Sequence, residues 1–326
     1  MQNNSQDITA ETIKKIVDVA RLAPSVHNTQ AWKVKIGPSS CQVIIDKRYA
    51  LSDGDPTGRQ AVIGIGIFCE ALVAVAADFR LQTTIGTYLD GAVTVHFHNK
   101  PTKQTTKQPY SELIASRATD RSIYKPVDIT DQNTAYLSSA AIGSSISIHV
   151  IRDKKQIDTI AELTSHGISL ALTSPAFRQE LSQYLVLPWS KKVRGISVMS
   201  LYIPTLVAII EPTLMRLGIG LPLEAKLEKR RWQSASAVIA ITADGDLTKY
   251  WFDVGRTYLR LSLYIEDLGL SQATSGAIVE ASNYHEDVES ILDTNQRILS
   301  MIRIGKGAKK RHHSPRISLD ELTASN

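Results

Sequence analysis

Three side chains that both donate and accept hydrogen bonds lie close together in one polar segment: Ser25, Asn28 and Gln30. A planar ligand with carbonyl groups and ring nitrogens, such as a flavin or a nucleobase, is recognised through edge contacts of this kind. The alternative is that these side chains satisfy the backbone of their own turn. The segment therefore predicts either a ligand-recognition loop or a self-contained turn.

A second group of side chains has the composition of an anion site. Arg117, Thr119 and Arg121 alternate along the segment RATDR, so they point to one side if the segment is extended. Two guanidinium groups and a hydroxyl then supply charge-assisted donors to a phosphate. The alternative is a solvated basic turn.

Further charged or titratable residues extend both groups. Arg316, with Lys309 and Lys310, would add positive charge to the same anion, although the alternative for the lysines is a solvated tail. His27 lies inside the polar loop and is a weak candidate for catalysis, because its reference pKa of about 6.5 suits proton exchange near neutrality. The alternative for His27 is a structural hydrogen-bonding role.

Hydrophobic periodicity predicts the elements that must position these groups. Ile13, Ile16, Val17 and Ala20 share one face, which predicts an amphipathic helix over 9–22 that ends before Pro24. The pattern predicts strands over 32–36, 41–45 and 92–97, and a largely apolar core helix over 58–79.

The second part of the chain repeats this order. Ile129-Thr130 is expected to open a helix as Ile8-Thr9 does, a strand follows at 148–151, and Gly255-Arg256 is expected to head a helix as Gly58-Arg59 does. We therefore predict two similar halves, residues 1–108 and 109–326, packed as an internal pseudo-dimer. The second half lacks the loop at 24–30. It also carries an insertion at about 160–232, interpreted as either a lid over a cavity or an added helical subdomain.

Composition limits the classes of protein that the chain can represent. With 326 residues, 43% hydrophobic and 21% charged, it can bury a large core. The net charge of +5 is matched by the basic residues of 306–316 alone, so nucleic-acid binding is not indicated. No disulfide framework or metal site is expected from two cysteines, which fits a reducing cytoplasm. No secretory signal is visible, and the apolar run at 195–210 is too short to span a membrane.

Four segments resemble the nitroreductase family. APSVHNTQAW (23–32) is similar to its flavin-binding loop, with Ala31 where proline is usual, and RATDR is similar to its phosphate clamp, with Thr119 in place of serine. The aromatic Tyr124 follows one residue later than in the usual pattern. DKRYALSDGDPTGRQAVIGIG (46–66) and HHSPRISLDEL (312–322) resemble the Acg-like branch, whose proteins are tandem nitroreductase halves with a helical lid.

The resemblance implies an α+β, nitroreductase-like fold that binds FMN noncovalently. It places the isoalloxazine and ribityl portions against Ser25, Asn28 and Gln30, and a backbone N–H near flavin N5 at Gly276. The phosphate would be held by Arg117, Thr119, Arg121 and Arg316. Because each half contributes only one of these groups, the resemblance implies one complete site per chain and a monomer that contains its own pseudo-dimer.

The implied activity is FMN-dependent, ping-pong hydride transfer through flavin N5, with NAD(P)H as the reductant and a small conjugated or electron-poor compound as the substrate. No motif indicates the direction of transfer. The alternative is an FMN-sequestering protein whose lid restricts access of the nicotinamide. A third interpretation is peripheral membrane association through residues 195–210.

Overall fold

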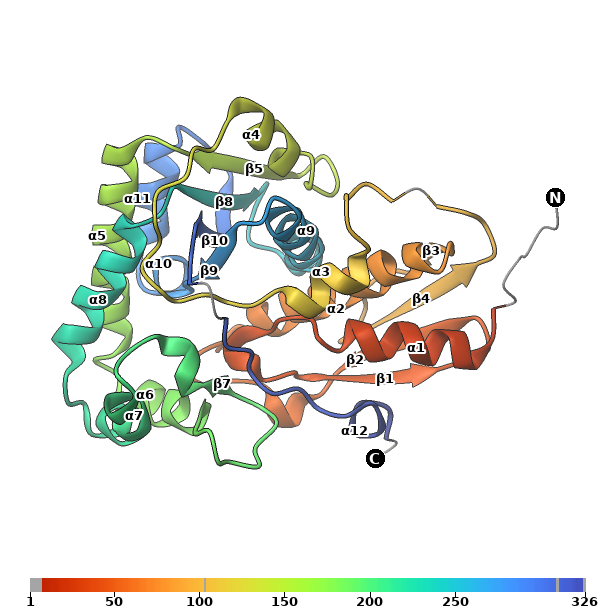
Figure 1. The fold of residues 1–326 in the computed structure, drawn as a ribbon, viewed down its shortest axis with the longest axis horizontal. Coiled ribbons are helices and arrows are strands. Elements are labelled where there is room, and N and C mark those ends of the chain that lie inside the picture. Colours follow the sequence, from red (N-terminus) through yellow and green to blue (C-terminus); the bar gives the residue numbers. More distant parts are fainter. Residues whose placement is uncertain (1–7, 103, 309–310, 325–326) are drawn as a thin grey trace.

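The computed structural model describes residues 8–102, 104–308 and 311–324, which form an α+β fold with two four-stranded antiparallel sheets (Figure 1). The first sheet has the strand order β1-β2-β4-β3. Its elements are α1 (Ala10–Ala20), β1 (Trp32–Ile36), β2 (Ser40–Ile45), α2 (Arg59–Asp78), β3 (Gln82–Ile85) and β4 (Ala92–His98). These bounds confirm the elements predicted for this half, and β3 is the one strand that the prediction missed.

The first helix shows how local sequence sets these bounds. The Thr9 side chain accepts a hydrogen bond from the Thr12 amide and so caps α1 at its N-terminus. The predicted stripe of Ile13, Ile16, Val17 and Ala20 is buried in the core. The helix ends ahead of Pro24, because the residue before a proline is excluded from helical geometry.

The second sheet repeats the topology of the first, with the order β5-β8-β10-β9. Its elements are α4 (Asp131–Ser138), β5 (Ile146–Ile151), β8 (Ala237–Ala243), α9 (Thr248–Asp267), β9 (Ser271–Thr274) and β10 (Arg297–Gly305). Helix, strand, strand, helix, strand and strand follow one another in both halves. The predicted boundary after residue 108 lies between the two sheets, and the assignment of domains stays a prediction.

The insertion interrupts the hairpin between β5 and β8. Residues 152–236 make this connection, whereas residues 37–39 connect β1 to β2. It contains α5 (Lys154–Ala171), α6 (Pro175–Gln183), β6 (Leu185–Val186), β7 (Ile196–Ser197), α7 (Thr205–Leu217) and α8 (Leu221–Gln233). Helices α5 and α8 pack together beside the second sheet, and α6 and α7 surround a small core of their own (Figure 1).

Four further helices complete the chain: α3 (Tyr110–Ser116), α10 (Ala277–Glu280), α11 (Tyr284–Ile291) and α12 (Leu319–Thr323). Strand β8 is buried along its whole length, because helices cover both faces of the second sheet. Ile239 and Ile241 of β8 face the main core, whereas Val238 and Ala240 face a second core under α5, α10 and α11. This alternation is the period of two that a strand imposes.

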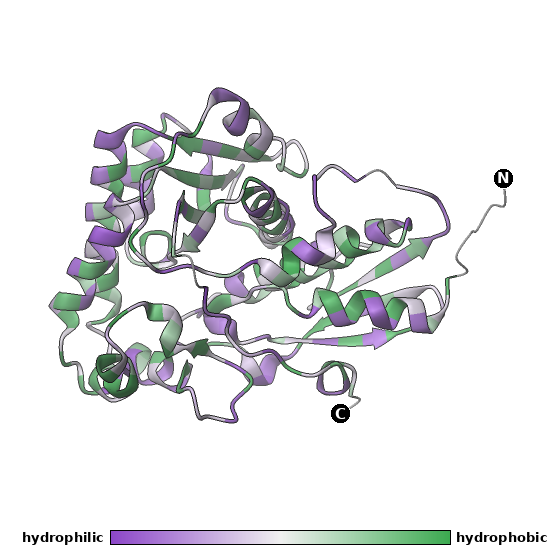
Figure 2. Cartoon of the chain, viewed as in Figure 1, coloured by the Kyte–Doolittle hydropathy of each residue, from purple (hydrophilic) through white to green (hydrophobic). Residues whose placement is uncertain are grey.

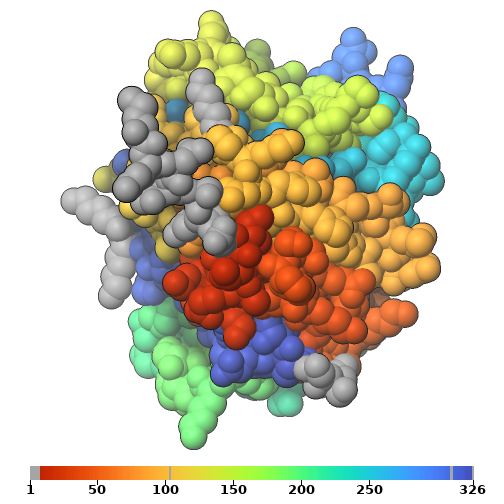
Figure 3. Space-filling view, turned by 90° about the vertical axis from the view of Figure 1, so that its right-hand side faces the viewer, coloured from red at the N-terminus to blue at the C-terminus, as the bar shows by residue number. Residues whose placement is uncertain are grey.

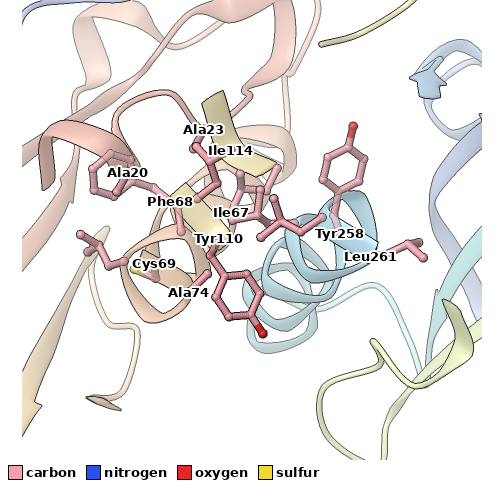
Figure 4. Packing of buried hydrophobic residues seen from close by; sticks show 14 of the residues in the cluster. Ala20, Ala23, Ile67, Phe68, Cys69, Ala74, Tyr110, Ile114, Tyr258 and Leu261 are labelled. Atoms are coloured by element: carbon pink, nitrogen blue, oxygen red, sulfur yellow. The ribbon is translucent and has the colours of Figure 1, made fainter. Parts of the chain in front are cut away.

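Helices α2 and α9 cross at the centre of the molecule, where their backbones touch (Figure 4). A Cβ atom at Gly66 would collide with the carbonyl oxygen of Phe252, and one at Gly255 would collide with the carbonyl oxygen of Ile63. Each helix thus presents one glycine to the other helix's backbone. The crossing holds the two sheets together at a distance that no larger residue would allow.

The start of α9 differs from the prediction. Gly255-Arg256 was expected to head this helix, but α9 begins at Thr248 and Gly255 lies in its interior. The residues before Gly255 continue the buried face of the helix, with Phe252 and Val254 in the main core. Gly255 is therefore a contact residue and not a helix start. The helix ends do correspond, since α2 ends at Asp78 and α9 at Asp267.

These two terminal aspartates hold the linker between the halves. The Asp78 carboxylate accepts hydrogen bonds from the backbone N–H groups of residues 110–111, and the Asp267 carboxylate accepts from those of residues 107–108. Buried Glu70 of α2 adds ion pairs to Arg256 and Arg260 of α9. Polar contacts therefore reinforce the glycine crossing along and at the end of both helices.

One helix in the described part of the chain, α2, is long and apolar enough to span a membrane, but most of it is buried in the core. Helices α7 and α8 pass the same test only as a pair, and they meet at an angle of 120°. The composition of α2 is explained by its central position, which confirms the predicted core helix.

We predict that Gly66→Ala lowers the free energy of unfolding by about 1–3 kcal/mol or more, because the backbones of α2 and α9 must separate to admit the methyl group. Gly64→Ala is the matched control in the same helix. A Cβ at Gly64 meets only the Trp32 ring at 3.8 Å, so this change should be neutral or stabilising. Urea unfolding of both variants checks the prediction, and equal stabilities would contradict it.

Candidate functional site

A pocket that is partly open to solvent lies where four distant segments meet. These are the N-terminal loop (residues 24–30), the arginine segment (residues 117–121), the insertion and the C-terminal segment (residues 311–324). Seven of the predicted site residues line it: Ser25, His27, Asn28, Arg117, Thr119, Arg121 and Arg316. Lys309 and Lys310 lie outside the described residues. Figure 3 shows the C-terminal segment, in blue, running between the first half and the insertion.

The arginine segment is extended and lies beside the edge strand β9. Thr119 pairs with Gln272, and the Asp120 amide donates to the Gln272 carbonyl. The Tyr124 hydroxyl donates to the Asp120 carbonyl at 2.7 Å, and buried Arg303 donates to the same carbonyl at 3.2 Å. Because Asp120 faces away from the pocket, where its carboxylate accepts backbone N–H groups, Arg117, Thr119 and Arg121 face into it together, as predicted from their alternation.

Three guanidinium groups, that of Arg117 buried and those of Arg121 and Arg316 half-buried, converge on this pocket without a neutralising carboxylate. Among the described residues, none of Arg117, Arg121 and Arg316 forms an ion pair. The Nε and Nη1 atoms of Arg117 also have no hydrogen-bond partner there. Burial lowers the pKa of Arg117, and it lowers the pKa of Arg121 to about 10 and that of Arg316 to about 9, helped by neighbouring arginines. Unpaired buried charge is costly, so this arrangement fits an anionic ligand.

Arg316 is partly satisfied by the backbone. Its Nη2 and Nε atoms donate to the Leu22 carbonyl at 3.1 and 3.3 Å, and its Nη1 donates to the carbonyls of Ser314 and Pro315. Arg316 thus joins the end of the first helix to the C-terminal segment while keeping its charge at the pocket. The side chain of Arg121 makes one long contact, 3.4 Å to the hydroxyl of Ser200.

The N-terminal loop combines a self-contained turn with contacts outside it. Ser25 Oγ accepts the Gln30 amide at 2.9 Å, which is the alternative left open for this residue. His27, Asn28 and Gln30 have φ angles of 45°, 55° and 49°, in the left-handed region that non-glycine residues rarely adopt. Such a conformation persists only where surrounding contacts over-determine it.

Asn28 connects the loop to two other segments. The side-chain Nδ2 atom of Asn28 donates to the backbone carbonyls of Gly195 and Pro315, both at 2.8 Å. The backbone carbonyl of Asn28 accepts a hydrogen bond from the Gly195 amide. Its Oδ1 atom is buried and has no partner among the described residues. This oxygen is free to accept a hydrogen bond from a ligand ring N–H. The donor set of the pocket therefore fits a phosphate-bearing ligand with a polar planar ring.

Two predicted contacts are not in the pocket. The side chain of Gln30 is fully buried behind the loop, donating to the Val193 carbonyl at 2.8 Å and accepting the Ile317 amide at 2.9 Å. Gly276 caps α10 and does not line the pocket; its nearest side-chain neighbour is Glu280, which pairs with Arg59. Gln30 thus supports the site from outside, because the insertion and the C-terminal segment occupy its hydrogen-bonding groups.

The catalytic role considered for His27 required a pKa near neutrality, and its environment does not allow one. Burial, with Arg121 nearby, lowers the pKa of His27 to about 4, so the ring is neutral near pH 7. Its Nδ1 atom is buried without a partner among the described residues, and the ring lies beside Phe177 and Tyr184 of the insertion. His27 is therefore suited to a neutral hydrogen bond and not to proton donation near neutrality.

Several residues that line the pocket were not predicted from the sequence. Ile196 and Ser200 come from the insertion, and His312, His313 and Ser314 precede Arg316. Burial and the adjacent arginines lower the pKa of His313, so it adds no charge near neutrality. For His312, His313 and Ser314, the sequence HHSPR (312–316) was the available signal. No local signal marks Ile196 or Ser200, whose placement depends on how the insertion folds back.

Comparison with known proteins supports the resemblance. The chain matches the Nitroreductase family over residues 3–55. Two relatives from Mycobacterium tuberculosis, both named as NAD(P)H nitroreductases, are Rv3131, 22% identical over 53% of this chain and 51% of its own, and acg, 24% identical over 53% and 54%. The chain spans about half the length of these curated relatives. The matches confirm the predicted resemblance to the nitroreductase family and its Acg-like branch.

A solved structure with a similar arrangement is the FMN-dependent nitroreductase NfnB from Mycobacterium smegmatis, determined in complex with NADPH. It is 17% identical, covers 66% of this chain and 96% of its own, and has a TM-score of 0.43.

We predict that His27 makes stability depend on pH in the acid range. The unfolded chain binds a proton at this residue below about pH 6.5, whereas the folded chain does so only below about pH 4. Stability is therefore lost as the pH falls through this window, by up to about 3 kcal/mol from this group. Urea unfolding between about pH 7 and pH 4 should give a shallower pH dependence for His27→Gln. Parallel curves for the two proteins would contradict the assignment.

Proposed function

We propose that the protein is an FMN-dependent oxidoreductase of the nitroreductase type. The observation that carries this proposal is the convergence of three arginines without carboxylate partners on one pocket, one buried and two half-buried, beside the Oδ1 acceptor of Asn28 that has no partner among the described residues. Arg117, Thr119, Arg121 and Arg316 would hold the phosphate, and Asn28 would accept from the ring. When bound, FMN supplies hydride transfer at N5, with NAD(P)H as the reductant and a small conjugated or electron-poor compound as the substrate.

The contribution of the chain is binding, orientation and exclusion of water. The extended arginine segment fixes its guanidinium groups before a ligand arrives, because its backbone is already hydrogen-bonded to β9, Tyr124 and Arg303. Neutral His27 and His313 leave the positive charge of the pocket to the arginines. Cys41 and Cys69 are buried free thiols, which is compatible with the reducing cytoplasm that we propose as the compartment.

The proposal includes one FMN per chain. The loop between α4 and β5, residues 139–145, is shorter than residues 21–31 between α1 and β1, so the second half has no counterpart of the N-terminal loop. The repeated topology supports a pseudo-dimer within one chain that acts as a monomer. A second pocket of the same kind would therefore lack the residues that bind the flavin ring.

A second candidate function, FMN sequestration, is supported by the covering segment (residues 193–200). Asn28 and Gln30 donate to its carbonyls at Gly195 and Val193, and the Ser314 hydroxyl accepts its Ser197 amide at 3.2 Å. Ser200 of this segment contacts Arg121. An insertion fastened over the pocket in this way would retain a bound ligand and restrict the access of a nicotinamide.

We predict that Arg117→Met and Arg121→Met each weaken FMN binding by about ten- to hundred-fold, because each removes charge-assisted bonds to the phosphate. The same changes should raise the stability of the ligand-free protein by about 1–3 kcal/mol, because an unpaired buried charge is replaced by an apolar side chain. Flavin titration and urea unfolding measure the two effects.

Arg152→Met is the matched control for these variants, since Arg152 forms a partly exposed ion pair with Asp131 and does not line the pocket. Unchanged FMN retention in both pocket variants would show that the phosphate site is wrongly placed.

The two candidate functions differ in their response to nicotinamide. We predict that anaerobic addition of NADH or NADPH to the FMN-loaded protein bleaches the flavin absorbance within seconds to minutes, as a reductase requires. Dithionite is the control that reduces any accessible flavin. Rapid bleaching by dithionite together with indefinite resistance to both nicotinamides would favour sequestration instead.

A further inference from the structure

Helix α7 carries large apolar residues on its exposed side as well as apolar residues on its buried side. Ala208 and Met215 face the small core of the insertion, and Glu211 lies on the same buried side. The exposed residues include Leu206, Val207, Ile210 and Leu217, together with the charged Arg216. Apolar residues on both sides of a helix are typical of a core or of a lipid contact, and α7 lies at the periphery of the molecule (Figures 1 and 2).

The exposed apolar surface continues from α7 around the corner into α8. Its members share an exposed fraction between 38% and 79%: Leu206, Val207, Ile210, Leu217, Ile219 and Leu223. We call these six residues the apolar corner. Gly218 and Gly220 make the sharp turn, with φ angles of 72° and 81° that favour glycine. The chain bends by 120° between α7 and α8 at this turn, so the exposed apolar residues of both helices lie at one corner of the insertion.

The charges around the corner are sorted by sign. The exposed charged residues of α7 and α8 are all basic: Arg216, Lys226 and Arg230. Their acidic residues are turned inward. Glu224 and Glu228 face buried Arg231 at 3.5 and 3.3 Å, and Glu228 also accepts the Trp232 indole N–H. Burial raises the pKa of Glu211 and of Glu224.

We propose that the apolar corner docks onto an anionic lipid surface. Exposed apolar side chains with exposed basic residues on the same two helices have the form of an interfacial membrane anchor, in which the leucines enter the acyl boundary and the cations meet lipid phosphates. A second copy of this chain is disfavoured, because two such faces would bring like charges together. The corner lies on the insertion, so this surface is independent of the flavin proposal. The corner would lie in the membrane–water interface and would not cross the membrane, since the bend between α7 and α8 and the charged residue Glu211 interrupt the apolar stretch.

The test is sedimentation of the full chain with vesicles of phosphatidylcholine, with and without phosphatidylglycerol. We expect binding to the anionic vesicles that weakens at high salt. The double variant Leu217→Glu/Leu223→Glu should reduce this binding by about a hundredfold, because two leucine side chains no longer enter the bilayer. Leu89→Glu is the control, since Leu89 is 68% exposed on the first half.

A second variant keeps the test informative if the first one misfolds. Replacing Arg216, Lys226 and Arg230 by glutamine should abolish the preference for anionic vesicles without changing the apolar surface. The proposal is overturned if the wild-type chain does not sediment with anionic vesicles, or if the leucine variant binds as well as Leu89→Glu does. A dimer seen by light scattering that the leucine variant dissociates, without vesicle binding, would assign the corner to a protein contact instead.

Discussion

The crossing of α2 and α9 is the constraint on which the rest of the structure depends. Gly66 and Gly255 let each helix touch the backbone of the other, and both helices pack on their own sheet, α2 on β2, β3 and β4 and α9 on β5, β8, β9 and β10. The N-terminal loop contacts α2 and leads into β1, whereas the arginine segment runs along β9, beside α9. The width of the pocket between them is therefore set by a contact that contains none of its residues.

The pocket contains groups that lower the stability of the folded chain. Three cations without carboxylates, one buried and two half-buried, and a loop with left-handed residues are each unfavourable in isolation. They persist because the surroundings hold them, through Tyr124 and Arg303 on one side and the covering segment on the other. Conflicts of this kind between local preference and final structure are typical of functional sites.

The sequence pattern predicted those features of the fold and the site that depend on residues close together in the chain. Periodicity located α1 and α2, and alternation brought Arg117, Thr119 and Arg121 to one side. It could not show that Gln30 turns away from the pocket, because the partners of that amide lie in the insertion and the C-terminal segment. The protonation of His27 depends equally on burial by distant residues, and the misread start of α9 shows that a glycine alone does not distinguish a helix end from a helix contact.

The C-terminal segment completes the pocket without belonging to either sheet. Residues 311–324 supply Arg316, hold Asn28 and Gln30 through backbone groups, and place Glu321 where its carbonyl accepts the Lys33 ammonium on β1. The last strand of the second sheet, β10, ends at Gly305, so the strand pairing of both sheets is complete without this segment. Proteolytic removal of residues 311–324 would therefore leave both sheets paired and take one wall from the pocket.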